Sequence, residues 1–299
     1  MIIEIDSLSQ LHKMAGLPAP QHPLISVVDI SEWEIGEDML AQKFCLQLYS
    51  IALKDGGCGM NYGRNSYDFS EGVLLFTAAG QTSSMQESQK KGERKGWMIF
   101  FHPDLIRNKQ LGQKIDDYHF FSYEVHEALH LSAAEQTILN RCVQLVEEEL
   151  EGRIDDHSQD VIVDHLQLLL TYSQRYYQRQ FNTRSAQNSD LLSRFEQLLK
   201  TYYQEGRFAE EGQPTVSYFA SELQLSANYL SDLIKKETGY GLKEKVQQFI
   251  VEKAKLFLLQ SELNINELAY QLGYNYPHYF SRMFKAKTGL TPKQYRKRG

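Results

Sequence analysis

The sequence has few cysteines and no long apolar run, and each absence excludes a class of protein. Cys45, Cys58 and Cys142 show neither C-x-x-C spacing nor an even-numbered set, which predicts isolated thiols in a reducing compartment. No stretch approaches the roughly eighteen uninterrupted apolar residues of a membrane-spanning helix. Residues 1–16 also lack the basic and apolar regions of a secretion signal. We therefore expect a cytoplasmic protein that makes no use of a membrane.

Most signatures of catalysis are also missing. The chain has no phosphate-binding glycine loop, no G-x-S-x-G and no H-x-H of a cupin metal site. One candidate is the stretch from His126 to His130, His-Glu-Ala-Leu-His, which matches the H-E-x-x-H pattern of zinc metalloproteases. That chemistry needs a stable helix and a third ligand. Ser132 is instead expected to start a new helix two residues later, and Glu135 and Thr137 stand at or near the offsets of the missing glycine and histidine.

We therefore expect no enzyme, no metal and no cofactor. The stretch 126–130 is expected to pack the first domain onto the helix that follows, with both histidines half exposed. The alternative is a metal-dependent hydrolase, or a cupin enzyme, fused to a DNA-binding domain.

Charge is divided unevenly along the 299 residues, a length that predicts two domains. Residues 212–299 contain 13 Lys and Arg against 7 Asp and Glu, a balance of +6, whereas residues 1–211 have a balance of −12. This asymmetry is typical of a nucleic-acid-binding module joined to a different domain, although some two-domain enzymes show it by chance.

Residues 1–131 are expected to form a β-rich domain. Residues 44–53 approximate the alternating pattern of a strand, and residues 72–77 and 96–101 are short apolar runs opened by glycine. Several short strands at even spacing predict a sandwich or small barrel. Phe76, Trp97 and Tyr67 belong either to its core or to the lining of a ligand pocket.

Residues 132–183 are expected to form a helical dimerisation segment, so the fold class is α+β. Ser132 and Glu135 make a capping box, and apolar residues continue at helical spacing to Leu150, before Gly152. A second helix is predicted from Ser158 to Phe181. Its apolar residues cover more than one stripe of the helix surface. Such a helix packs on two sides, against its own domain and against a partner, or it lies entirely in the core of its own domain. The polar residues 183–189 are expected to form a linker.

Residues 190–299 are expected to be helical, and the pattern repeats. Short helices at Val216–Leu223 and Ile265–Leu272 each precede a turn and a longer helix that ends at Gly239 or Gly289. Leu230, Leu233 and Ile234 are apolar like the residues fifty positions later, and Lys235, Thr238 and Gly239 are identical to them. This is the pattern of two helix-turn-helix units. Ala220 and Ala269 would let the paired helices approach closely.

A rigid spacer separates the two units. Leu242–Leu259 contains neither glycine nor proline, and a helix of this length spans about 27 Å. Successive major grooves on one side of B-DNA recur about 34 Å apart. The spacer therefore favours two reading helices in adjacent grooves.

Apolar spacing also predicts which side chains face DNA. Leu230, Leu233 and Ile234, with Phe280, Met283 and Phe284, repeat at i, i+3, i+4 and are expected to be buried. Residues near the start of each second helix would then face bases, and lysines further along would contact phosphates. The expected DNA-binding residues are Asn228, Ser231, Asp232, Lys235, Lys236, His278, Ser281, Arg282, Lys285 and Lys287.

The C-terminal pattern resembles that of AraC/XylS-type transcription regulators. The resemblance covers roughly residues 210–299 and is carried by residues 265–274, 279–285 and 289–296. Residues 72–81 and 96–106 are similar, more loosely, to the cupin-like sensor domains that often precede this module. Two positions depart from the family. Ile250 stands where many members have arginine, and Asp232 stands where basic or neutral residues are common, which implies weak reading by the first unit.

The resemblance implies a sequence-specific regulator of transcription, either an activator or a repressor. Its expected partners are double-stranded promoter DNA, RNA polymerase and a second copy of the chain, with a small effector acting at the N-terminal domain. A first domain that serves only for dimerisation or partner contact is a further alternative.

Overall fold

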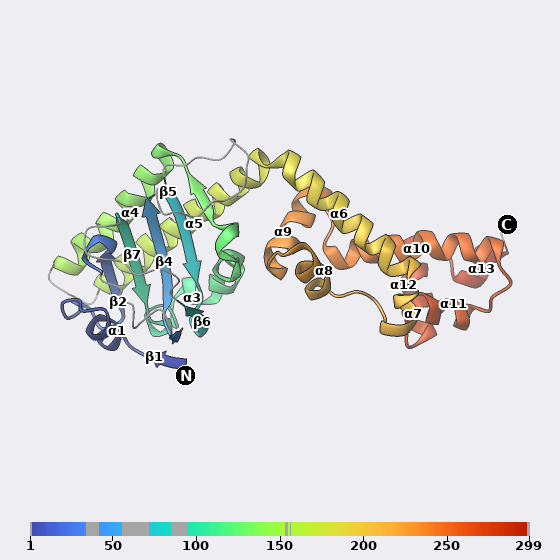
Figure 1. The fold of residues 1–299 in the computed structure, drawn as a ribbon, viewed down its shortest axis with the longest axis horizontal. Helices are drawn as coiled ribbons and strands as arrows, with labels where there is room; N and C mark the ends of the chain where they lie inside the picture. Colours follow the sequence, from blue (N-terminus) through green and yellow to red (C-terminus); the bar gives the residue numbers. More distant parts are fainter. Residues whose placement is uncertain are drawn as a thin grey trace. The chain divides into compact units, whose positions relative to one another are not determined.

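The computed structural model describes residues 2–33, 42–55, 72–84, 95–152, 155 and 157–297, and Figure 1 shows their arrangement. They form two compact units, Met1–Arg184 and Ser185–Gly299. The first contains two sheets and several helices and the second is helical, so the α+β class is confirmed. In the described part of the chain, no helix is both long and apolar enough to cross a membrane.

The larger sheet of the first unit is antiparallel and has five strands. Their order is β2 (Ile25–Asp29), β7 (Gly96–Phe101), β4 (Tyr49–Asp55), β5 (Gly72–Thr77) and β8 (Leu129–Leu131). The predicted strands at 72–77 and 96–101 are confirmed. Gly96 is required here, because a Cβ at this residue would lie 2.0 Å from the Leu53 carbonyl oxygen on the neighbouring strand.

The smaller sheet has three strands, β1 (Ile2–Ile5), β3 (Lys43–Leu46) and β6 (Gln81–Ser84). The single strand predicted over residues 44–53 is therefore wrong. The strand is interrupted at Gln47 and Leu48. As a result, β3 pairs with β1 and β6, whereas β4 belongs to the larger sheet. Local alternation is the same on both sides of the break, and only long-range pairing separates the two strands.

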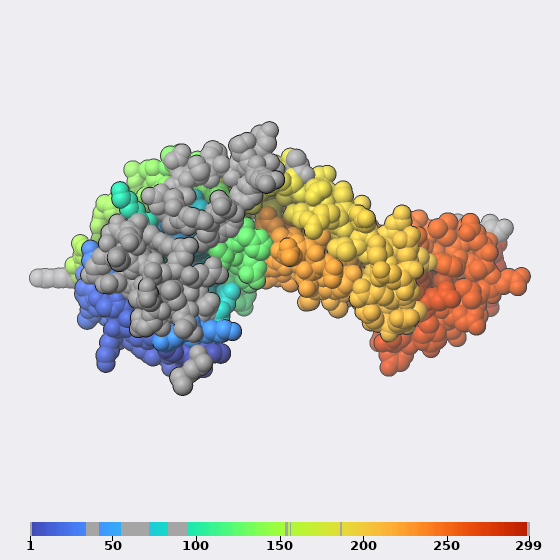
Figure 2. Space-filling model, in the orientation of Figure 1, coloured from blue at the N-terminus to red at the C-terminus, as the bar shows by residue number. Residues whose placement is uncertain are grey.

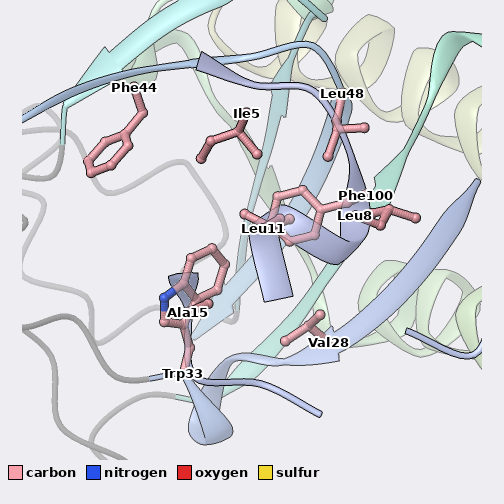
Figure 3. Packing of buried hydrophobic residues seen from close by; sticks show 9 residues of the cluster. All are labelled: Ile5, Leu8, Leu11, Ala15, Val28, Trp33, Phe44, Leu48 and Phe100. Carbon is pink, nitrogen blue, oxygen red and sulfur yellow. The ribbon is translucent and has the colours of Figure 1, made fainter. Parts of the chain in front are cut away.

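One apolar core lies between the small sheet, helix α1 (Leu8–Met14) and one face of the large sheet. Figure 3 shows nine buried side chains of this core, which come from α1, from strands of both sheets and from the segments beside them. Within the same region is a cavity of about 140 Å³ that is lined almost entirely by apolar side chains: Ile5, Leu11, Met14, Ala15, Trp33, Phe44, Leu46, Met98 and Phe100, with Ser50 and Thr77.

The opposite face of the large sheet packs against aromatic residues and helix α5 (Ser158–Thr183). The rings of Phe76 and Phe120 lie 4.3 Å apart, and Phe120 stacks on Tyr177 of α5 at 5.3 Å. Phe76 is therefore a core residue. Trp97 does not line the apolar cavity, because its indole Nε1 donates to Asn140 Oδ1 at 2.8 Å. Tyr67, the third residue considered for a pocket, lies outside the described residues.

Helices α4 (Ala133–Glu151) and α5 follow as an antiparallel pair. The predicted capping box is confirmed, because Ser132 Oγ accepts from Glu135 N and the Glu135 carboxylate accepts from Ser132 N. The predicted linker at 183–189 does contain the boundary between the two units, but it is helical rather than irregular. Only Arg184 lies between α5 and helix α6 (Ser185–Gln204). A run of Ser, Gln and Asn is polar, but these residues can still form a helix.

Candidate nucleic-acid interface

The first helix-turn-helix unit consists of α8 (Val216–Leu223) and α9 (Ala227–Thr238). Thr215 and Ser226 start these helices, since each side-chain oxygen accepts a backbone N–H three residues later. Ala220 of α8 is buried, and α8 contacts α9. In Figure 2, helix α6 (yellow) lies along α8 and α9 (orange), which it contacts. Tyr229 of α9 is buried, with only 4% of its surface exposed.

The second unit consists of α11 (Ile265–Gln271) and α12 (Pro277–Thr288). Asn264 caps α11 through a capping box with Glu267, Pro277 occupies the first turn of α12, and Gly289 ends it with φ +78°. The end of this helix at Gly289 was predicted. A short helix, α13 (Pro292–Arg296), follows.

Gly273, in the turn of the second unit, is constrained in two ways. Its φ of +79° favours glycine, and a Cβ there would lie 3.0 Å from Gln213 N and 3.1 Å from Phe208 O. The second constraint arises because helix α7 (Arg207–Glu211) and the residues after it pack against α11.

The spacer is helix α10 (Leu242–Gln260), which is 19 residues long and spans about 28 Å. The prediction of an unbroken helix is confirmed. Ile250, where many relatives of the resembled family carry arginine, is fully buried, as is Ala254 one turn later. An apolar side chain is therefore the one that this environment accommodates.

Arg207 of helix α7 lies between an aromatic ring of α6 and one of α8, and so connects these three helices. The Arg207 guanidinium carbon lies 4.4 Å from the Tyr202 ring centroid and 4.8 Å from that of Tyr218. Its nitrogens donate to both Glu211 carboxylate oxygens at 2.9 and 3.0 Å. The hydrogen bonds from Arg207 lower the pKa of Glu211 and raise the pKa of Arg207.

The residues expected to be buried lie inside, with one exception. Leu230, Leu233, Ile234, Phe280 and Phe284 are buried, whereas Met283 is half-buried. Of the expected DNA-binding residues, seven are exposed: Asn228, Lys235, Lys236, His278, Arg282, Lys285 and Lys287.

The other three expected contacts, Ser231, Asp232 and Ser281, are half-buried. The Ser231 hydroxyl donates to Ala227 O at 2.7 Å, so a base would meet it as an acceptor.

Two exposed tyrosines beside these residues were not among the predicted contacts. Tyr276 is 61% exposed and Tyr279 is 53% exposed, and their rings lie 5.8 and 4.2 Å from that of His278. Residue types alone gave little indication of this, because the equivalent of Tyr279 in the first unit is the buried Tyr229. The signal that was present is Tyr276 itself, at a position where the repeat has the helix-capping Ser226.

The His126–His130 stretch does not form a zinc-protease helix. His126 lies in a short 3₁₀ helix, η5 (Val125–Glu127), whereas His130 lies in strand β8. His126 is exposed and His130 is buried, so the prediction that both are half exposed is wrong. Within the described residues, no three His, Cys, Asp or Glu side chains are placed to hold a metal ion.

Strand β8 is held instead by the end of α5. The buried Gln180 amide accepts from His130 N at 2.8 Å and donates to Ala128 O at 3.0 Å. Arg179 donates to His130 O and to both carboxylate oxygens of Glu135. The stretch therefore joins the sheet mainly to α5, whereas the sequence predicted packing on α4, the helix that follows it.

Comparisons with known proteins identify the same C-terminal region. A family model described as a helix-turn-helix domain matches residues 219–298. The chain is 31% identical over 141 residues to the HTH-type transcriptional regulator YfiF of Bacillus subtilis, a match that covers 46% of this chain and 41% of YfiF. It is 31% identical over 81 residues to the HTH-type transcriptional activator RhaR of Cronobacter sakazakii, covering 27% of this chain and 29% of RhaR.

Among solved structures, the chain is similar to the C-terminal domain of the two-component response regulator yesN from Fusobacterium nucleatum. The identity is 38%, the coverage is 34% of this chain and 96% of that domain, and the TM-score is 0.30. The chain spans less than half the length of each of the curated relatives YfiF and RhaR.

Proposed function

We propose that the chain is a sequence-specific DNA-binding regulator of transcription of the AraC/XylS type, and the match of residues 219–298 to a helix-turn-helix domain supports this. Its partner is double-stranded promoter DNA in the cytoplasm. The observation that carries this proposal is the pair of helix-turn-helix units joined by the single helix α10. Each unit presents one face of its second helix to solvent.

We propose that α9 and α12 enter successive major grooves on one side of the duplex. The spacer length of about 28 Å, with the units at its ends, matches the repeat of about 34 Å between major grooves. Arg282 reads guanine and Asn228 reads adenine through paired hydrogen bonds, and His278, Ser231 and Ser281 lie beside them. Asp232 accepts a hydrogen bond from cytosine, and its charge keeps binding by the first unit weak. Lys235, Lys236, Lys285 and Lys287 contact phosphates.

Selection of binding sites from a random duplex library with the full chain tests this proposal. The expected result is one enriched sequence with two conserved windows about one helical turn apart, bound far more tightly than random DNA. Equal affinity for all duplexes would contradict it. A reporter gene under a promoter that carries the selected site then shows whether transcription rises or falls. A rise would support the further proposal that the bound protein contacts RNA polymerase, as an activator.

The N-terminal compact unit, Met1–Arg184, is proposed to be a cupin-like sensor for a small apolar effector. The apolar cavity between the sheets supports this, since about 140 Å³ accommodates a molecule of roughly the size of benzene. Benzene and small alkylbenzenes are therefore suitable probes, and they should raise the thermal midpoint of the full chain. Ala15→Leu, which partly fills the cavity, should abolish the shift. No shift with any probe would favour a first unit that serves only for contact with partners.

A homodimer through residues 132–183 is the proposed assembly. Ile138 and Leu145 of α4 and Leu168 of α5 are exposed apolar side chains on these helices, which supports a contact with a second copy. Sedimentation of the full chain against the triple variant with Gln at these positions tests it. A change from dimer to monomer is expected, and an unchanged mass would contradict it. We further propose that the chain is not an enzyme, since the one candidate motif is divided between η5 and β8.

A further inference from the structure

The recognition helices of the two helix-turn-helix units, α9 and α12, begin differently, although they are copies of one repeat. Ser226 starts α9, and its Oγ accepts a hydrogen bond from Tyr229 N at 3.1 Å. Tyr276 holds the same position fifty residues later, and its side chain makes no capping hydrogen bond. A tyrosine cannot replace the cap, because its hydroxyl lies too far from its own backbone. The second unit thus lacks a stabilising interaction that the first one has.

In place of the cap, the start of α12 carries exposed aromatic rings. Tyr276 and Tyr279 are both more than half exposed, whereas the repeat partner of Tyr279 in the first unit is buried. The rings of Tyr276 and Tyr279 lie 6.0 Å apart in an edge-on arrangement, and His278 lies against Tyr279. Large exposed apolar groups that lie together indicate a binding surface more often than an accident of folding.

The neighbours of these rings determine what they can bind. Arg282 lies one helical turn after Tyr279, on the same side of α12, and Lys285 follows after three more residues; both are exposed. This positive charge fits a nucleic acid backbone. In the major groove of DNA, the apolar group that a ring can contact is the C5-methyl of thymine.

We propose that Tyr276 and Tyr279 pack against thymine methyl groups and make the second unit selective for thymine at one or two positions of its site. This inference rests on the proposed function and adds to it the kind of base that is read. The hydroxyl groups are not required, since the contact is made by the ring. The first unit has no equivalent, because Ser226 is a cap and Tyr229 is buried.

The test replaces single thymines of the selected site by deoxyuridine, which removes only the methyl group. For the full-length wild-type chain, affinity should fall about fourfold at one or two positions of the second window, the factor that corresponds to one buried methyl group. Tyr276→Ser should bind thymine and uracil equally at one of these positions. Its thermal midpoint should be equal to or higher than that of the wild type, because serine restores the cap.

Two further variants complete the design. Tyr276→Phe should keep the discrimination, whereas a uniform loss of affinity in this variant would show a phosphate contact through the hydroxyl and overturn the proposal. Tyr240→Ser removes another exposed tyrosine, which follows α9, and should leave the discrimination unchanged. Specific binding with equal affinity for thymine and uracil at every position would overturn this inference alone. Absence of specific binding to any duplex would overturn the proposed function with it.

Discussion

Lys287, at the end of the second recognition helix, donates to the Glu244 carboxylate of the spacer helix at 2.5 Å. This ion pair links α12 to α10 and places the Lys287 charge next to an opposite one. Lys285, two residues earlier, points from another side of the helix and is exposed. The two lysines, equivalent in the sequence pattern, are therefore expected to contribute differently to DNA binding.

Lys285→Ala should lower affinity for all duplexes alike and make the slope of log K against log salt shallower by about 1. Lys287→Ala should change that slope less, because Glu244 already neutralises part of its charge. Titration of the selected site and of a random duplex at several salt concentrations measures both variants. Equal slopes for the two variants would contradict the assignment of Lys285 as the phosphate contact.

Arg282→Ala should weaken binding to the selected site by about 1–3 kcal/mol and relax the preference at one base pair. The reason is that a bidentate contact to guanine is lost while the phosphate contacts remain. A gel-shift panel with each base pair of the second window varied measures it. Arg296→Ala is a suitable control, since this arginine donates to Leu263 O and lies after the recognition helix. Unchanged discrimination at every position in Arg282→Ala would disprove the contact.

Gly273→Ala should destabilise the chain by about 2–4 kcal/mol, as judged by urea unfolding. The added Cβ meets the backbone around Gln213 and is held in a backbone conformation that alanine rarely adopts. Gly289→Ala is the matched control. Its φ of +78° is close to the +79° of Gly273, but an added Cβ would meet no neighbouring atom within 4 Å. It should cost about 1 kcal/mol. If the two variants were equally stable, the close approach of the chain near α7 would not be a constraint.

The predictions that succeeded depend on interactions within a few residues. Ser132 and Gly239 set helix ends through local hydrogen bonds or a left-handed turn, and the sequence shows these signals directly. The strand expected at 44–53 failed because the division between two sheets is decided by distant partners.

The site followed the same rule. Periodicity placed the exposed residues of α9 and α12 correctly, with the half-buried Ser231, Asp232 and Ser281 as exceptions. It did not distinguish Tyr229 from Tyr279, because burial depends on neighbours from elsewhere in the chain, which a local pattern does not show.

Gln180→Leu should destabilise the chain by about 2–4 kcal/mol, because it leaves the His130 amide and the Ala128 carbonyl buried without their partner. Gln180→Glu keeps the acceptor but, as a carboxylate, loses the donor, so its effect should include the repulsion between the carboxylate and the Ala128 oxygen. Thermal unfolding of both variants measures this. A surface control such as Gln178→Leu, two residues away on α5, should remain within about 0.5 kcal/mol of the wild type. Wild-type stability in Gln180→Leu would show that the junction between β8 and α5 is not held by this amide.

Hydroxyl-radical footprinting of the full chain on its selected site tests the central claim most directly. Two helix-turn-helix units fixed by one spacer helix should protect two windows on the same side of the duplex, with centres about 10.5 base pairs apart. Arg282→Ala should weaken protection in one window more than in the other. A single protected window, or two windows on opposite sides of the duplex, would contradict the account.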